Sequence, residues 1–176
     1  TKKYFNDVLV EGKSKIKMLS VAEENPDEPI ETFTIRKGKA NGKLSGGNLS
    51  VLVSLIGTEY DTDFDSKIIF IEEIGEEPYR IDRMLTQMIQ SGKFNKAAGI
   101  ALGVFRKCES KKVEPSFENS FTLKEVLYDR LSGLGIPVAY GLSFGHIKNK
   151  FTLPLGIEAE FDADKKTITL LENSVI

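Results

Sequence analysis

Short runs of apolar, often β-branched residues recur along the chain, separated by polar segments rich in turn-forming residues. Such runs predict strands, because strands buried in a sheet present hydrophobic side chains to both faces. Where apolar and polar positions alternate instead, a strand is buried on one face only. We therefore expect strands at residues 16–21, 31–36, 67–71, 98–105 and 136–140, and a closing hairpin of 151–161 with 167–171 around a turn at 162–166.

Two segments carry apolar residues at the three- and four-residue spacing of an amphipathic helix. Residues 79–91 have this spacing and are followed by Gly92, a residue type that commonly ends helices. Residues 122–131 have it too, and Thr122 with Glu125 forms the sequence signature of a capping box at the start. Both segments are therefore predicted to be helices.

The glycine-rich segment 37–48 and the residues after it permit more than one structure. The Asn-Gly pair at 41–42 indicates a hairpin turn. The apolar residues 49–57 fit either a short helix or a buried strand, and Asn48, a good N-cap, favours a helix that begins at Leu49. Strands mixed with helices, without a repeat or a linker, predict one α/β domain with strands of mixed direction.

The composition is that of a globular protein with balanced charge. The 176 residues fit one domain, and 24 Lys and Arg against 26 Asp and Glu give a net charge of -2 and a pI near 5.6. This balance gives no basic face for nucleic acid, so no nucleic-acid partner is expected. Cys108 alone cannot form an internal disulfide, and its polar neighbours predict a surface position. The sequence has no apolar run long enough for a membrane span and no pattern of a signal peptide. We therefore expect a cytoplasmic protein with no membrane partner.

His146 is the only histidine of the chain, which restricts the chemistry that imidazole can perform here. Zinc motifs and facial triads that use two histidines are excluded, and we expect no metal and no cofactor. His146 follows Gly145 in a loop after a predicted strand, where it is accessible for general base chemistry. The alternative interpretation is an incidental surface histidine.

Glu72 directly follows the apolar run 67–71, at the carboxyl end of a predicted strand. This is where α/β proteins place functional groups, so Glu72 is a candidate catalytic carboxylate. The alternative is a solvated residue that opens a loop, because Glu73 and further acidic residues follow it.

Two other motifs carry candidate chemistry beside a simpler alternative. Gly46, Gly47 and Asn48 are able to present backbone N–H groups to an anion, or to form a tight turn. The segment 141–145 matches the nucleophile-elbow pattern G-x-S-x-G. That pattern works as a strand, a turn and a helix, and no helix is predicted after it, so Ser143 is not expected to be a nucleophile.

Four segments share an order and a spacing that are specific when taken together: residues 46–58, 67–94, 99–108 and 136–156. They include the strand that ends in glutamate, the following YRIDRML helix, and the sequence GLSFGHIKNKFTLPLG. In these features the chain resembles the C-terminal domain of the LD-carboxypeptidase family. That family includes murein tetrapeptide LD-carboxypeptidases and microcin C self-immunity peptidases.

The resemblance implies a swivelling β/β/α-type domain, an α/β fold with a mixed sheet or barrel-like core and flanking helices. Residues 1–176 are then a single domain, the C-terminal domain of a two-domain serine peptidase whose N-terminal nucleophile domain is absent. Glu72 and His146 match the glutamate and the histidine of the family's Ser–His–Glu triad. The serine would belong to the absent domain.

The function that the resemblance implies is cleavage of a terminal D-amino acid from murein peptides. The chain alone would be inactive, and Gly46, Gly47 and Asn48 would bind substrate in the cleft between the domains. The expected partners are the absent N-terminal domain, a murein or related peptide, and a second copy in a homodimer. Two alternatives stay open: a microcin C-type immunity peptidase of the same family, and a non-catalytic peptide-binding or dimerisation module.

Overall fold

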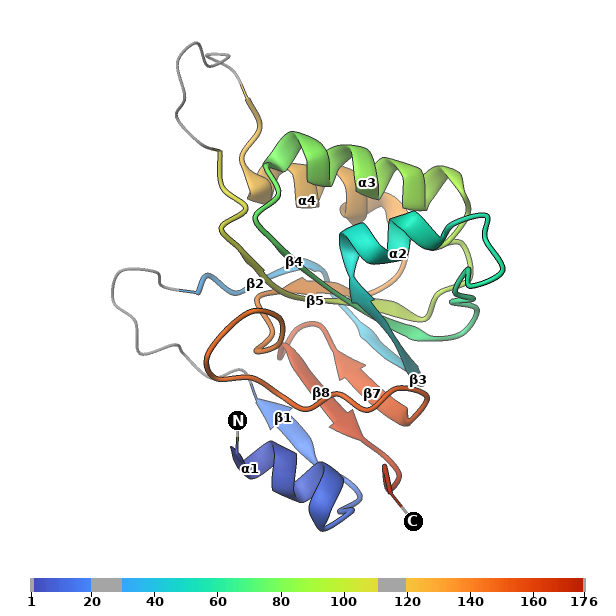
Figure 1. Ribbon diagram of the computed structural model, residues 1–176, viewed down its shortest axis with the longest axis vertical. Coiled ribbons are helices and arrows are strands. Elements are labelled where there is room, and N and C mark those ends of the chain that lie inside the picture. The colour runs from blue at the N-terminus through green and yellow to red at the C-terminus, as the bar shows by residue number, and fades with distance from the viewer. Residues whose placement is uncertain (1, 20–29, 111–119, 176) are drawn as a thin grey trace.

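A mixed β-sheet with its three longest helices on one face organises the part of the chain that the structure describes. The computed structural model describes residues 2–19, 30–110 and 120–175, and within these ranges the strand order is β1-β8-β7-β3-β4-β5-β6-β2 (Figure 1). The strands are β1 (Lys17–Leu19), β2 (Phe33–Arg36), β3 (Lys39–Asn48), β4 (Ile68–Ile74), β5 (Gly99–Arg106), β6 (Val138–Tyr140), β7 (Glu158–Asp162) and β8 (Thr167–Leu170). The helices are α1 (Lys2–Phe5), the π-helical η1 (Asn6–Val10), α2 (Leu49–Leu55), α3 (Pro78–Gln90), α4 (Leu123–Leu131) and the 3₁₀ turn η2 (Ser132–Leu134).

Strand β3 joins an antiparallel part of the sheet to a parallel part. Its first half pairs antiparallel with β7, and its second half pairs parallel with β4. The pairs β4–β5 and β5–β6 are parallel as well, and β2 adds antiparallel to β6. The mixed strand direction predicted from the sequence is confirmed.

The hairpin turn predicted at residues 41–42 is wrong, because both residues lie within β3. The glycines of β3 serve close packing instead. A Cβ on Gly42 would lie 2.3 Å from the carbonyl oxygen of Ser66, and one on Gly46 would lie 1.9 Å from that of Phe70. Backbones that approach this closely leave no room for a side chain.

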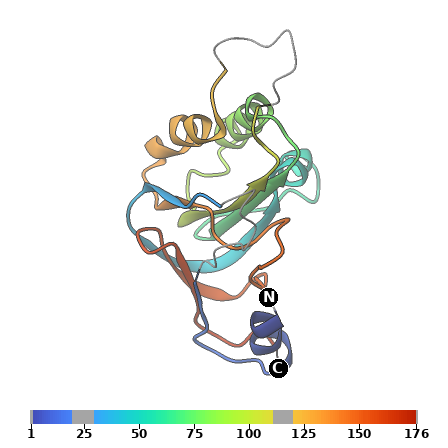
Figure 2. The same ribbon diagram turned by 90° about the vertical axis from the view of Figure 1, so that its left-hand side faces the viewer.

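Helices α2, α3 and α4 lie together on one side of the sheet (Figures 1 and 2). Helix α2 begins at Asn48, whose side chain accepts a hydrogen bond from the Val51 N–H, so the helix favoured by the sequence is confirmed. Helix α4 begins with the predicted capping box of Thr122 and Glu125. Helix α3 closely follows the predicted range, and Gly92 comes just after its end with a positive φ.

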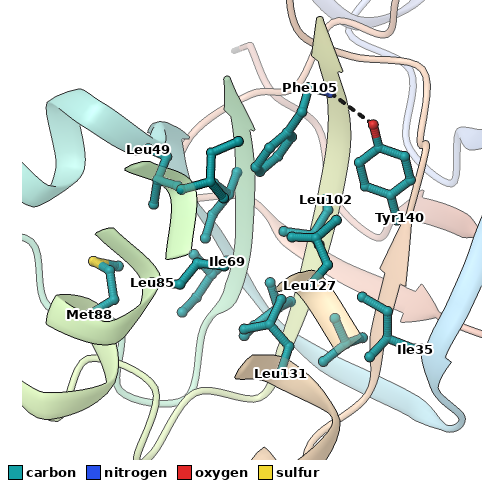
Figure 3. Close-up of a cluster of buried hydrophobic side chains, with 14 of the residues drawn as sticks. Ile35, Leu49, Ile69, Leu85, Met88, Leu102, Phe105, Leu127, Leu131 and Tyr140 are labelled. Carbon is teal, nitrogen blue, oxygen red and sulfur yellow. Dashed lines mark hydrogen bonds between the residues drawn. The ribbon is translucent and has the colours of Figure 1, made fainter. Parts of the chain in front are cut away.

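Two hydrophobic cores occupy the two faces of the sheet. The first joins the apolar sides of the helices to the central strands (Figure 3), and its members include Leu49, Leu85, Met88, Leu127, Ile69 and Leu102. The second core joins Ile68 and Ala101 of the central strands to Phe161 and Ile168 of β7 and β8. A Cβ on Gly99 of β5 would lie 3.2 Å from the Phe161 ring, although two strands separate β5 from β7 in the sheet. The sheet therefore curls over itself, as a barrel-like core requires.

The other strands predicted from the sequence are present in the structure, but their first and last residues differ from the predicted ones. The runs at 67–71, 98–105 and 136–140 correspond to β4, β5 and β6, and the closing hairpin corresponds to β7 and β8. Residues 151–157 are not part of a strand, so the first arm of that hairpin is shorter than predicted. Residues 20–21 of the first predicted strand lie outside the described residues. In the described ranges, no helix has the length and apolarity needed to cross a membrane.

Candidate active site

Glu72 and His146 lie side by side at the carboxyl end of β4, although they are 74 residues apart in the sequence. The distance between His146 Nδ1 and Glu72 Oε2 is 2.7 Å, which is a hydrogen bond. The Glu72 side chain is 13% exposed and the His146 side chain 52%. The structure thus brings together the two residues that the sequence singled out, with the carboxylate recessed and the imidazole open to solvent.

An irregularity in strand β5 carries the histidine loop to Glu72. The pairing of β4 with β5 shifts register beside Glu72, where β5 has one residue more than β4. Such a β-bulge bends a strand and changes the partners that it offers. Val104, within the bulge, forms an isolated parallel bridge to Gly145, the residue before His146. The bulge therefore positions the loop from which the imidazole projects.

Two glycines make the approach of this loop sterically possible. Gly145 has a φ of +105°, and a Cβ there would lie 3.0 Å from Glu72 Oε2. A Cβ on Gly103, in the bulge, would lie 2.5 Å from the Phe144 ring. Because larger residues at either position would push the loop outward, both glycines contribute to the contact between the carboxylate and the imidazole.

The hydrogen bond to Glu72 decides which imidazole nitrogen is basic. A carboxylate only accepts hydrogen bonds, so the neutral His146 ring carries its hydrogen on Nδ1 and its lone pair on Nε2. In this tautomer Nε2 has the free lone pair that a general base needs, and the carboxylate lies where it would stabilise an imidazolium. The pair has the arrangement of the base and the acid of a catalytic triad.

A pocket of about 360 Å³ lies beside the pair. Glu72, His146, Gly47 and Asn48 all contribute to its lining. Gly46, the third residue predicted to bind substrate, is not part of the lining and packs against β4 instead. Sequence reasoning did not assign the rest of the lining to the site, although all but Phe70 belong to the segment GLSFGHIKNKFTLPLG: Phe70, Phe144, Gly145, Lys150, Phe151 and Leu153.

Asn48 and Glu73 form a hydrogen-bonded group behind Glu72. Asn48 Nδ2 donates to Glu72 Oε1 at 3.2 Å and to Glu73 Oε1 at 2.9 Å. Glu73 is 2% exposed, so the alternative of a solvated acidic run does not hold for it. The alternation of side chains along β4 is the signal that could have found it, because neighbours in a strand point to opposite faces.

Ser143 is buried, with 1% of the residue exposed. No helix follows it, and its carbonyl oxygen accepts a hydrogen bond from the Phe151 N–H at 2.6 Å. The strand, turn and helix that expose the serine of a nucleophile elbow are therefore not formed at residues 141–150. This position agrees with the prediction that Ser143 is not a nucleophile.

Cys108 is also buried, so the surface position predicted for it is wrong. It lies two residues after the end of β5, and its side chain belongs to the core beneath the helices. The polar residues next to it in sequence do not report this, because burial here is decided by the helices that pack over the sheet. Burial raises the pKa of the Cys108 thiol to about 11.

We expect Cys108 to react with a disulfide reagent such as DTNB at least ~100-fold more slowly in the folded chain than in urea, at pH 8. A pKa of about 11 in place of 9.0 leaves ~100-fold less thiolate, the reactive form. Absorbance of the released thiolate measures both rates, and the unfolded chain serves as the control. Equal rates in the two states would contradict the buried position.

Comparison with known proteins places this geometry in context. The sequence profile described as the LD-carboxypeptidase C-terminal domain matches residues 41–161. The chain is 46% identical over 146 residues to a putative carboxypeptidase of Synechocystis, covering 83% of this chain and 47% of that protein. It is 41% identical over 133 residues to a probable murein peptide carboxypeptidase of Bacillus subtilis, covering 76% of this chain and 40% of that protein.

The fold has matches among solved structures as well. The crystal structure of muramoyltetrapeptide carboxypeptidase from Oxalobacter formigenes aligns with a TM-score of 0.76 at 30% identity, covering 97% of this chain and 53% of that one. The chain thus spans about half of the length of the proteins that it matches, or less. The profile match at residues 41–161 includes both β4 and the loop that carries His146.

Proposed function

The chain belongs to the LD-carboxypeptidase C-terminal domain family, and on that premise we propose that it is the half of a serine peptidase that supplies the glutamate and the histidine of a Ser–His–Glu triad. Relatives named as carboxypeptidases support a hydrolase. The proposed reaction is cleavage of a terminal D-amino acid from a murein peptide, because murein and muramoyl peptides are the substrates in the names of two matched proteins.

The observation that carries this proposal is the 2.7 Å hydrogen bond between His146 and Glu72. The bond joins the only imidazole of the chain to a recessed carboxylate at the mouth of a pocket. A histidine that merely happened to lie on the surface would not need a glycine loop, a bulge and a recessed carboxylate to hold it. The contact therefore favours an enzyme over the alternative of a non-catalytic binding module.

In the proposed mechanism the nucleophilic serine comes from a domain that precedes this chain. His146 Nε2 takes the proton of the serine hydroxyl as that oxygen attacks the peptide carbonyl. Glu72 accepts the hydrogen bond of the Nδ1–H and stabilises the imidazolium. His146 then gives the proton to the departing amine of the D-amino acid, and a water molecule activated in the same way releases the acyl group.

We expect the purified chain to release no D-alanine from a murein tetrapeptide, and to gain activity when the serine-bearing domain is joined to it or added in trans. The chain supplies the base and the acid, and Ser143 is too buried to replace the nucleophile. Chromatographic detection of released D-alanine measures both states. A microcin-type aminoacyl adenylate assayed in parallel separates the two substrate classes of the family.

The variant Ser143→Ala is the control for this assay. It should leave the activity of the reconstituted protein unchanged, because the proposal gives Ser143 no part in catalysis. Hydrolysis by the chain alone that Ser143→Ala abolishes would overturn the proposed division of the triad between two domains.

A further inference from the structure

A buried carboxylate that the proposed mechanism does not use lies directly next to Glu72. Glu73 Oε2 accepts hydrogen bonds from the Ser50 N–H at 2.8 Å and from the Ser50 hydroxyl at 2.6 Å. Glu73 Oε1 accepts from the Ile74 N–H at 2.8 Å and from Asn48 Nδ2 at 2.9 Å. Four donors thus hold this carboxylate in one orientation at the junction of β4 with the start of α2.

The orientation of the Asn48 amide follows from its three partners. Its Oδ1 accepts the Val51 N–H at 3.2 Å, and its Nδ2 donates one hydrogen each to Glu72 and Glu73. The reversed amide would point an oxygen at two carboxylates and an NH₂ group at an N–H donor, so it is excluded. Both amide hydrogens are therefore committed to the two carboxylates.

This arrangement divides the two oxygens of Glu72 between two partners. Oε1 receives the Asn48 amide, and Oε2 receives the imidazole of His146. We infer that Asn48 and Glu73 are positioning residues: the buried Glu73 fixes Asn48, and Asn48 holds the Glu72 carboxylate so that Oε2 meets Nδ1 of His146. The effect of Asn48 and Glu73 that we expect on catalysis rests on the proposed function. Their expected effect on the tautomer of the His146 ring does not.

The same contacts change the role assigned to Asn48 from the sequence. Asn48 lines the pocket, which fits the prediction that it binds substrate. An amide whose two hydrogens and one acceptor oxygen are already used has little capacity left for a ligand. The two roles differ in kinetics, because a lost substrate contact raises KM, whereas a misplaced catalytic carboxylate lowers kcat.

His146 makes the inference testable without any assay of activity. As the only histidine, it gives one unambiguous set of imidazole ¹⁵N signals, whose shifts report the tautomer of the neutral ring. In the unaltered chain we expect the Nδ1–H tautomer. The variants Asn48→Asp and Glu73→Gln should shift the ring toward the Nε2–H tautomer, because Glu72 is no longer held against Nδ1. Asn48→Asp keeps the acceptor oxygen that caps α2, but it removes the two amide donors and places a third carboxylate beside Glu72 and Glu73, which further disfavours the present position of Glu72.

Three further variants complete the experiment. Glu72→Gln gives the reference spectrum for a lost carboxylate, and Thr122→Ala removes the N-cap of α4 and should leave the tautomer unchanged. Ser50→Ala removes a single hydrogen bond to Glu73 and serves if either main variant fails to fold. In the protein joined to its serine-bearing domain, Asn48→Asp should lower kcat about tenfold to a hundredfold with KM nearly unchanged.

The outcomes separate this inference from the proposed function. An unchanged tautomer in folded Asn48→Asp and Glu73→Gln overturns the positioning role and leaves the pairing of Glu72 with His146 intact. A rise in KM with normal kcat overturns it in favour of substrate binding. An unaltered chain whose neutral ring lacks the Nδ1–H tautomer overturns the pairing itself, and with it both proposals.

Discussion

Replacing His146 with alanine, in a protein that joins this chain to the serine-bearing domain, is expected to lower kcat for D-amino acid release by about 10⁴- to 10⁶-fold. Without the imidazole, no group takes the proton from the serine or returns it to the departing amine. The His146 side chain is 52% exposed, so the fold should hardly be affected. Steady-state kinetics measures the loss, and thermal unfolding checks that the variant is folded.

The companion variant Glu72→Gln should cost about 10⁴-fold in kcat. Its side-chain NH₂ is able to donate to Nδ1, which places the ring hydrogen on Nε2, where the base is needed. Glu59→Gln, on the exposed loop between α2 and the amino end of β4, is the matched control and should be neutral. Full activity in Glu72→Gln, or an equal loss in Glu59→Gln, would count against the triad.

Replacing Gly46 with alanine is expected to destabilise the fold by about 3 kcal/mol. The new Cβ would lie 1.9 Å from the Phe70 carbonyl oxygen, a distance at which β3 and β4 cannot stay paired as they are. For a domain of this size the loss corresponds to a fall in Tm of roughly 6–12 °C. Chemical denaturation and thermal unfolding measure the change.

Gly47→Ala is the matched control for that prediction. Gly46 has a φ of +147° and Gly47 one of +158°, so both substitutions strain the backbone, but nothing lies within 4 Å of a Cβ on Gly47. We expect Gly47→Ala to cost about 1 kcal/mol. If the two variants were equally stable, the close approach of β3 to β4 would not be what requires glycine at 46.

The elements that could be predicted from the sequence are those whose signals are local. The capping box at Thr122, the N-cap at Asn48 and the helical spacing in 79–91 act within a few residues, and the structure has a helix at each. The strand at 67–71 was recognisable because its side chains are apolar on both faces. Such signals depend little on the rest of the chain.

The predictions that failed concern residues whose environment is set by distant parts of the chain. The pair at 41–42 is a good turn sequence, but β3 needs a glycine at 42 because Ser66 approaches it there. Cys108 stands among charged neighbours in sequence and is nevertheless buried by the helices that pack over the sheet. Local preference gave way to tertiary packing in both cases.

In the candidate site, too, local sequence signals determine one part and tertiary packing determines the other. The sequence by itself determined the chemical groups: a single imidazole in a glycine-flanked loop, and a carboxylate at the end of an apolar strand. Only the tertiary structure decided that His146 and Glu72 meet at 2.7 Å, because the contact depends on the β5 bulge and on glycines that allow the loop to approach. It also decided that Glu73 is buried behind them, held by backbone and side-chain donors that come together only when β3, α2 and β4 are packed.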